Sequence, residues 1–174
     1  MAVEGVTVGR EGVPVVFLLV GLTGSGKTTY SRDRLEPTGA VRLSVDEVVH
    51  DRHGRYGVDY PENTYFEKEA PVVAELQEQL VQLVAEGRDV VWDHGLWPRK
   101  HREEMKQLVE RAGARWRLLY FPVERAELLR RLEERNQRAD ANSLFVSTEA
   151  LDDFFARFEA PQGEGEEIVS PDWL

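Results

Sequence analysis

One glycine-rich stretch, Gly21-Leu-Thr-Gly-Ser-Gly-Lys-Thr28, limits most strongly what this chain can fold into. It follows the apolar run PVVFLLV (14–20), which is typical of a strand buried on both faces of a parallel sheet. A polar helix opening comes directly after it. The stretch fits the pattern G-x-x-x-x-G-K-[ST] at every position, in the strand–loop–helix context that this phosphate-binding loop (P-loop) requires.

Each residue type in the P-loop suits phosphate binding. Glycines let the backbone curl so that successive N–H groups point at phosphate oxygens, and the N-terminal end of the following helix adds positive charge. Lys27 can reach the β- and γ-phosphates, and the Thr28 hydroxyl can ligate Mg²⁺. The alternative is a glycine-rich turn that binds nothing. We expect a nucleoside triphosphate to bind the loop residues Gly21, Leu22, Thr23, Gly24, Ser25, Gly26, Lys27, Thr28 and Thr29.

Short apolar runs recur along the chain and alternate with helical patterns. Candidate strands follow at 40–44, 89–92 and 116–121, with a possible fifth at 167–170, and helical stripes lie near 72–84, 105–112, 128–132 and 151–158. This alternation predicts an α/β fold with a mainly parallel sheet. At 174 residues we expect one domain, 1–174, with an N-terminal extension (1–13) and an acidic C-terminal tail (162–174). The tail would add an edge strand or stay mobile.

The charge balance and the cysteine count exclude several function classes. A formal net charge of −10 argues against unspecific binding to nucleic acid or to an anionic membrane, although a single nucleic-acid end remains open. The chain has no cysteine, which excludes disulfides and thiolate metal sites. Its start lacks the features of a signal peptide, and its apolar run is too short to span a bilayer. We expect a soluble, cytoplasmic protein, monomeric or homodimeric.

Two aspartates follow predicted strands, at the edge of a parallel sheet where ligands bind. Asp46, in RLSVDEV, can accept a proton from an attacking hydroxyl or bind substrate; the alternative is a helix N-cap. Asp93, in DVVWDHG, can hold Mg²⁺ through water, bind substrate or serve a structural role. His94 beside it is more typical of a satisfied polar residue than of a catalyst.

Arginines cluster in LLRRLEERNQR (128–138). Arg131, Arg135 and Arg138 are spaced by four and three residues, close to one helical face. Guanidinium groups there can stabilise a transferring phosphoryl group and stack on adenine, while the alternative is a solvated face paired with neighbouring glutamates. The following stretch, 136–146, reads as a lid over the nucleotide.

Aromatic and basic residues gather in the segment 47–70 and after the third predicted strand. Together they can sandwich a sugar, a nucleoside or an aromatic ring, or the segment is a surface excursion held by its tyrosines. Arg99, Lys100 and Arg102 would close the same pocket. The expected substrate-binding residues are Asp46, Tyr56, Asp93, Trp97 and Arg99.

The set FLLVGLTGSGKTT, RLSVDEV, VVWDHG, LRRLEERN and RFEAP resembles the small P-loop kinases of the AAA_33-type family, over about 15–161. This group is related to polynucleotide 5′-hydroxyl kinase domains, chloramphenicol phosphotransferase and zeta toxins. The resemblance implies a three-layer α/β/α core with five strands in the order 2-3-1-4-5. It also implies a base role for Asp46, phosphate roles for Lys27 and Thr28, and lid roles for Arg131 and Arg135. Relatives often carry D-x-T after the third strand, whereas this chain has Asp93-His-Gly-Leu-Trp97.

These observations together predict a phosphotransferase that uses Mg²⁺ and ATP, with GTP still open. The acceptor would be a hydroxyl on a small molecule: a nucleoside, a sugar-bearing metabolite or an antibiotic. Two alternatives remain, an ATP-binding regulator or ATPase without such an acceptor, and a polynucleotide 5′-hydroxyl kinase. ATP is favoured by the resemblance, and the chain has no guanine-reading Asn-Lys-x-Asp pattern.

Overall fold

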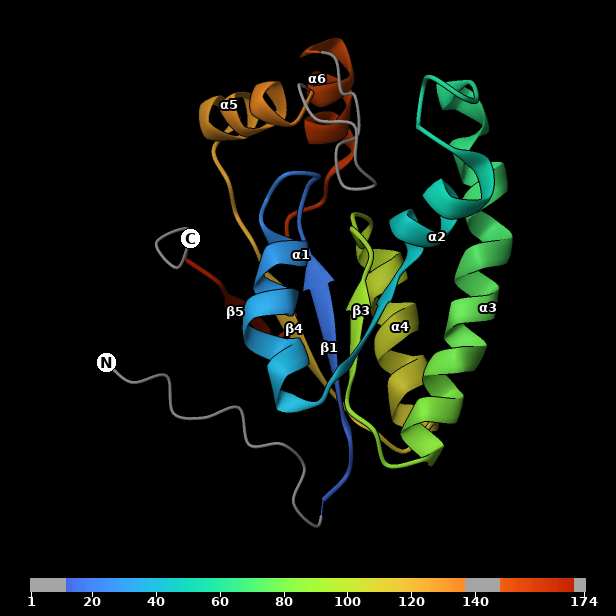
Figure 1. Ribbon diagram of the computed structural model, residues 1–174. Coiled ribbons are helices and arrows are strands. Elements are labelled where there is room, and N and C mark those ends of the chain that lie inside the picture. The colour runs from blue at the N-terminus through green and yellow to red at the C-terminus, as the bar shows by residue number, and fades with distance from the viewer. Residues whose placement is uncertain (1–11, 137–147, 171–174) are drawn as a thin grey trace.

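Five strands form one sheet in which every neighbouring pair runs parallel, in the order β2-β3-β1-β4-β5 (Figure 1). The computed structural model describes residues 12–136 and 148–170. The strands are β1 (Val15–Val20), β2 (Val41–Ser44), β3 (Val90–Asp93), β4 (Arg115–Tyr120) and β5 (Glu166–Ile168). The predicted α/β fold and its strand order are therefore confirmed.

Helices connect the strands on both sides of the sheet. The first helix, α1 (Lys27–Tyr30), continues into a π-helical turn, η1 (Ser31–Leu35), and a 3-10 turn, η2 (Glu36–Thr38). The others are α2 (Val45–His53), the 3-10 turn η3 (Glu62–Thr64), α3 (Tyr65–Ala85), α4 (Arg99–Arg111), α5 (Arg125–Asn136) and α6 (Thr148–Arg157). In the described part of the chain, no helix has the length and apolar character needed to cross a membrane.

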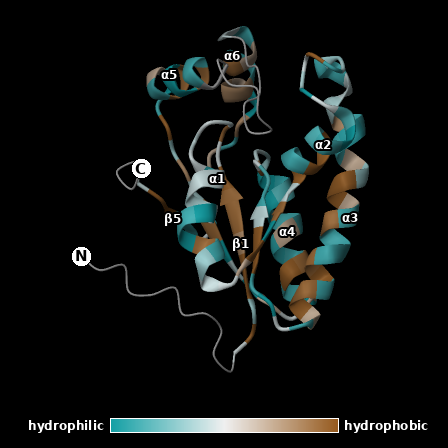
Figure 2. Cartoon of the chain, viewed as in Figure 1, coloured by the Kyte–Doolittle hydropathy of each residue, from teal (hydrophilic) through white to brown (hydrophobic). Residues whose placement is uncertain are grey.

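Alternate residues of β1 face the two sides of the sheet. Val16, Leu18 and Val20 belong to the core cluster formed with α3 and α4. Val15, Phe17 and Leu19 belong to the opposite cluster, which includes Leu35 of η1. Burial on both faces explains why this strand reads as a continuous apolar run rather than as an alternating one. The hydropathy colouring shows β1 enclosed in this way, with polar helix faces turned outward (Figure 2).

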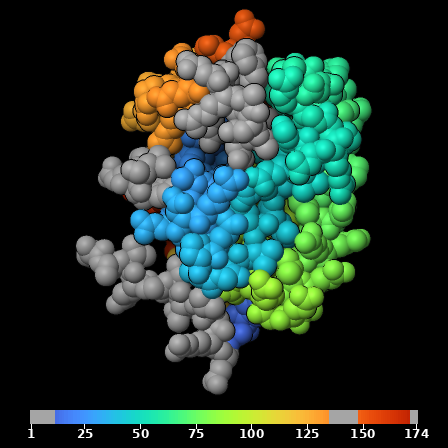
Figure 3. Space-filling view, viewed as in Figure 1, coloured from blue at the N-terminus to red at the C-terminus, as the bar shows by residue number. Residues whose placement is uncertain are grey.

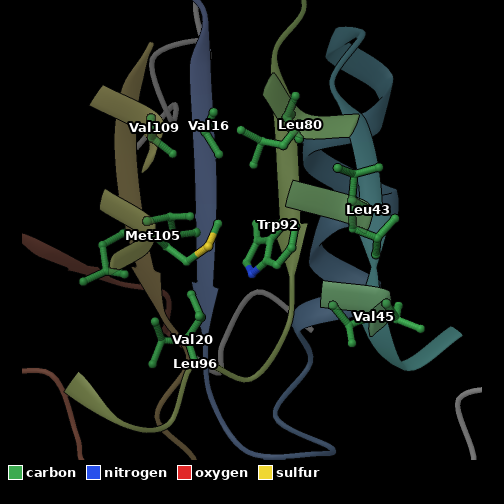
Figure 4. Packing of buried hydrophobic residues seen from close by; sticks show 14 of the residues in the cluster. Val16, Val20, Leu43, Val45, Leu80, Trp92, Leu96, Met105 and Val109 are labelled. Atoms are coloured by element: carbon green, nitrogen blue, oxygen red, sulfur yellow. The ribbon is translucent and has the colours of Figure 1, made fainter. Parts of the chain in front are cut away.

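Trp92 fills the middle of the larger core cluster. Its side chain is fully buried, with Met105 on one side and Leu43 on the other (Figure 4). Leu80 of α3 and Val109 of α4 complete the packing between the helices and the sheet. Each fully buried Leu or Val side chain stabilises the fold by about 1.5–3 kcal/mol. This packing therefore holds β3, and with it Asp93 at the end of the strand, in a fixed position.

The C-terminal segment is built into the fold. The expectation of an edge strand is confirmed by β5, which pairs with β4. Glu164, just before it, is 6% exposed and forms a two-pronged ion pair with Arg102, with Nε to Oε1 at 2.8 Å and Nη2 to Oε2 at 2.9 Å. Arg102 also donates to the carbonyl oxygens of Leu96 and Trp97, at 2.9 and 2.8 Å. The expectation that Arg102 closes the acceptor pocket is wrong, because this ion pair holds it in the interior.

Replacing Glu164 by alanine should leave the Arg102 guanidinium buried without its carboxylate. Because an uncompensated buried charge is costly, we expect a loss of about 3–5 kcal/mol in the free energy of unfolding, measured by urea denaturation. Glu167→Ala is the matched control, since Glu167 pairs with Arg117 at 2.7 Å on the surface. That change should cost no more than about 1 kcal/mol, and equal losses in the two variants would contradict the account.

Candidate active site

The P-loop connects β1 to α1 at the upper end of the sheet in Figure 1. Gly24 and Gly26 have φ angles of 87° and 97°, in the left-handed region that favours glycine. A Cβ atom on Gly24 would lie 2.9 Å from the Leu128 side chain of α5. The loop therefore needs glycine at Gly24 for its backbone conformation and for the close approach of α5.

Lys27 is the first residue of α1 and extends its ammonium group back over the loop. Its Nζ donates to the carbonyl oxygens of Gly21 at 2.9 Å and Leu22 at 3.0 Å. Only 9% of the residue is exposed, so the charge lies within the loop rather than in solvent. A lysine held in this position suits a polyphosphate bound to the loop.

The Thr28 hydroxyl donates to Asp93 Oδ2 at 2.9 Å, which joins the start of α1 to the end of β3. Both groups offer the hard oxygen atoms that Mg²⁺ prefers, and Mg²⁺ usually takes few protein ligands and completes its shell with water and phosphate. In the described residues, no group of three or more His, Cys, Asp or Glu side chains could form a dedicated metal cage. The Thr28–Asp93 pair therefore fits Mg²⁺ that accompanies a nucleotide.

Arg42 of β2 lies beside this pair, and sequence reasoning missed it. Its side chain is 6% exposed, with Nη1 at 3.7 Å from Asp93 Oδ2 and Nη2 bonded to Glu47 of α2. Glu47 also pairs with Arg32 of η1 at 3.1 Å, and α1–η1 and α2 form one continuous surface here (Figure 3). The only available signal was an arginine inside an otherwise apolar strand.

Asp46 lies in the first turn of α2, just after the end of β2. Ser44 is the N-cap, and its Oγ accepts from the Glu47 amide at 3.3 Å. The alternative interpretation of Asp46 as the cap is therefore wrong. Instead, the hydroxyl of Tyr65 donates to Asp46 Oδ1. The carboxylate thus already holds a hydroxyl group at the edge of the sheet where β2 and β3 end.

Three tyrosines pack together next to Asp46. The rings of Tyr60 and Tyr65 stack with centroids 6.5 Å apart, and Tyr56 meets Tyr65 edge-on at 5.5 Å. Tyr60 is 8% exposed and belongs to the main core, so it serves to hold the segment on the body of the protein. Burial, and then the negative charge of Asp46, raises the pKa of Tyr60 to about 12.

His94 forms an ion pair with Glu69 of α3, with Nε2 and Oε1 2.9 Å apart. Burial alone would lower the pKa of His94, but the hydrogen bond and charge of Glu69, together with the charge of Asp46, outweigh burial and raise it. The positive charge of Lys27 opposes this rise. The pairing with Glu69 had no local signal, because the two residues are far apart in sequence.

Trp97 and Arg99, also expected to bind the acceptor, contact the P-loop and the segment after α6 instead of the tyrosines. Trp97 donates from its indole nitrogen to the Gly21 carbonyl at 3.3 Å and packs on Phe154 of α6, with ring centroids 5.0 Å apart. Trp97 therefore stabilises the P-loop. The Arg99 amide donates to Glu159 at 3.0 Å, and its side chain, 58% exposed, pairs loosely with Glu103.

Arg131 of α5 contacts the P-loop although the two are far apart in the sequence. Its Nη1 donates to the Gly24 carbonyl at 3.2 Å, while its Nε bonds Glu127 at 2.9 Å. Hydrogen bonds from Arg130 and Arg131 lower the pKa of Glu127 to about 2. The side chain of Arg135, Arg138 and the expected lid beyond its first residue, Asn136, lie outside what the structure describes; the backbone of Asn136 ends α5.

Comparisons with known proteins agree with this architecture. The AAA_33 family model, an AAA domain, matches residues 16–161. No curated protein matches the chain significantly by sequence. A candidate kinase from Chloroflexus aurantiacus superposes with a TM-score of 0.70 at 17% identity, covering 91% of this chain and 88% of the other.

Two further solved structures share the fold. A gluconokinase from Sinorhizobium meliloti gives a TM-score of 0.62 at 19% identity, over 90% of this chain and 82% of that protein. A chain of the Pnkp1/Rnl/Hen1 RNA repair complex gives 0.68 at 19% identity, over 86% of this chain and 45% of that chain. At these identities the similarity establishes the fold.

The raised pKa of Tyr60 gives a prediction at alkaline pH. Since the folded state resists ionisation of this phenol, its contribution to stability is complete below about pH 10, the ordinary tyrosine value, and is lost as pH rises through about 12. We expect the free energy of unfolding to fall across this range, and to fall less in Tyr60→Phe. Urea denaturation at a series of pH values measures both, and parallel curves for the two proteins would contradict the assignment.

Proposed function

The chain belongs to the AAA_33 family, and we propose that it is an ATP-dependent phosphotransferase that moves the γ-phosphate to a hydroxyl of a small molecule. One observation carries the proposal. The P-loop, the Thr28–Asp93 oxygen pair and a separate carboxylate, Asp46, which already binds a hydroxyl, meet at the same edge of the sheet. Kinases among the structural neighbours support the reaction class.

The P-loop side would bind and neutralise the triphosphate. Lys27 and the loop amides would hold the β- and γ-phosphates, and Thr28 and Asp93 would hold Mg²⁺, which neutralises phosphate charge when bound. Arg131, which donates to the Gly24 carbonyl, would add positive charge as the phosphoryl group transfers.

Asp46 would serve the acceptor side as the general base. The acceptor oxygen forms a bond to the γ-phosphorus while the bond from that phosphorus to the β,γ-bridging oxygen breaks, and ADP leaves. The hydroxyl proton passes to the Asp46 carboxylate. A positioned base of this kind contributes about 10²–10⁴-fold to the rate.

The charges around the acceptor side favour a small molecule over a polynucleotide end. Basic side chains in this region pair with carboxylates: Arg52, in the last turn of α2, with Glu75 at 2.9 Å, and Arg55, just after α2, with Asp59 at 3.2 Å. Arg102, expected to close the acceptor pocket, is buried and so offers no positive charge to a polynucleotide. Tyr56 and Tyr65 are only half-buried, and the exposed parts of their rings would give a sugar or an aromatic ring an apolar contact.

Incubation with MgATP and a mixed panel tests the proposal. The panel holds nucleosides, sugars, aminoglycosides, other hydroxylated antibiotics and 5′-hydroxyl oligonucleotides, and mass spectrometry detects added phosphate. We expect one of the small-molecule classes to be phosphorylated. Phosphorylation of the oligonucleotides alone would contradict the small-molecule acceptor, and ATP binding without transfer to any compound would favour a regulator.

Lys27→Ala removes the charge that faces the phosphates. Transfer should fall by at least about 10²-fold, because this ammonium acts on charge that develops during the reaction. The rate of product formation at saturating MgATP is the measurement. A rate within a few-fold of the wild type would remove the P-loop from the proposed mechanism.

Asp46→Asn keeps the shape of the side chain but removes its ability to take a proton. We expect transfer to slow by about 10²–10⁴-fold while the affinity for MgADP, measured by calorimetry, stays unchanged. Asp51→Asn on the same helix is the matched control, because the Asp51 side chain is 78% exposed, and this variant should behave as the wild type. Equal activity in the two variants would exclude Asp46 as the base.

A further inference from the structure

The contact between Tyr65 and Asp46 affects whether Asp46 takes a proton from an acceptor hydroxyl or from water. This inference rests on the proposed function. Tyr65 donates its hydroxyl hydrogen to Oδ1 of the carboxylate that would act as base. An acceptor alcohol must make this same contact before it can lose its proton. Tyr65 therefore occupies the place that an acceptor hydroxyl would take on Oδ1 of Asp46.

The Tyr65 ring is held firmly in this place. It opens α3, directly after the 3-10 turn η3, so its backbone belongs to a 21-residue helix. Tyr60 stacks on it at 6.5 Å, and Tyr56 and Phe66 meet it edge-on at 5.5 and 6.0 Å. These contacts fix the direction of the phenol, so the hydrogen bond to Asp46 costs little conformational entropy.

The Tyr65 hydroxyl keeps its proton at neutral pH and so stays a hydrogen-bond donor. Burial, and then the charges of Asp46 and Glu69, raises its pKa well above the ordinary tyrosine value. Water would therefore have to replace a donor that the surrounding rings already hold against Asp46.

Phosphorylation of Tyr65 itself is disfavoured by the same surroundings. Both Asp46 and Glu69 act on the phenol with negative charge, and a phosphate ester there would add about two more charges beside them. Tyr65 is therefore suited to cover the base rather than to receive the phosphate.

We infer that Tyr65 is a specificity-determining residue that keeps Asp46 from activating water and yields the carboxylate only to an acceptor that takes over the hydrogen bond of the phenol. The ring stays in place, and only its hydroxyl hydrogen turns away. An acceptor that also contacts the protein around Asp46 gains the binding energy needed for this exchange, whereas water has no such contact. In the acceptor-free protein, hydrolysis would require water to form the bond to the γ-phosphorus, ADP to leave and the water proton to reach Asp46. The Tyr65 hydrogen bond suppresses this last transfer.

The test is the rate of MgATP hydrolysis with no acceptor added. Tyr65→Phe keeps the ring and its packing but removes the donor, so hydrolysis should rise by about tenfold, the equivalent of a modest hydrogen bond to a charged group. Tyr120→Phe is the matched control, since Tyr120 stacks on Phe158 away from Asp46, at 6.1 Å between centroids. Thermal unfolding and MgADP titration verify that each variant is folded and binds nucleotide.

A double variant, Tyr65→Phe with Asp46→Asn, tests whether Asp46 is the base responsible for the faster hydrolysis. We expect the increase in the hydrolysis rate to vanish, so that the double variant hydrolyses ATP as slowly as Asp46→Asn. A Tyr65→Phe protein that binds MgATP but hydrolyses it no faster than the wild type overturns the inference alone. A wild-type protein that does not bind MgATP contradicts the proposed function together with this inference.

Discussion

The parallel arrangement of β1, β2 and β3 is the constraint on which the rest of the structure depends. Parallel strands end at the same edge, so the P-loop after β1, Asp46 after β2 and Asp93 at the end of β3 meet although they are distant in sequence. The double-sided core around β1 and Trp92 holds these ends in register. Any change that shifted the sheet would separate the phosphate side from the acceptor side.

Charge is distributed unevenly across this edge. Lys27 and Arg131 donate to carbonyl oxygens of the P-loop, while the charges of Asp46 and Glu69 both act on Tyr65. His94, at the end of β3, pairs with Glu69. In the proposed reaction, the cationic side would hold the phosphates and Asp46 would take up the proton of the acceptor hydroxyl.

Sequence reasoning identified what depends on local pattern. The glycine-rich loop, the apolar strands and the two strand-end aspartates follow from short motifs, because backbone conformation and strand burial leave a local signature. Arg102 was misplaced, since nothing near it indicates that Glu164, a residue of the acidic tail, would neutralise it in the interior.

The sequence did not reveal the roles of Tyr65 and Glu69, and the reasons are similar for both. Tyr65 was one of three similar tyrosines, and only the packing of α3 against α2 decides which of them meets Asp46. The partner of His94 likewise depends on how α3 crosses the end of β3. Long-range pairing of this kind leaves no periodicity in the sequence.

A crystal structure with MgADP and aluminium fluoride, a mimic of the transferring phosphoryl group, tests the central claim most directly. The account predicts the fluoride between the Lys27 ammonium and the Asp46 carboxylate, with Mg²⁺ at Thr28 and Asp93. A fluoride bound by the P-loop but remote from Asp46 would contradict the assignment of Asp46 to the reaction. A nucleotide bound away from the P-loop would contradict the whole arrangement.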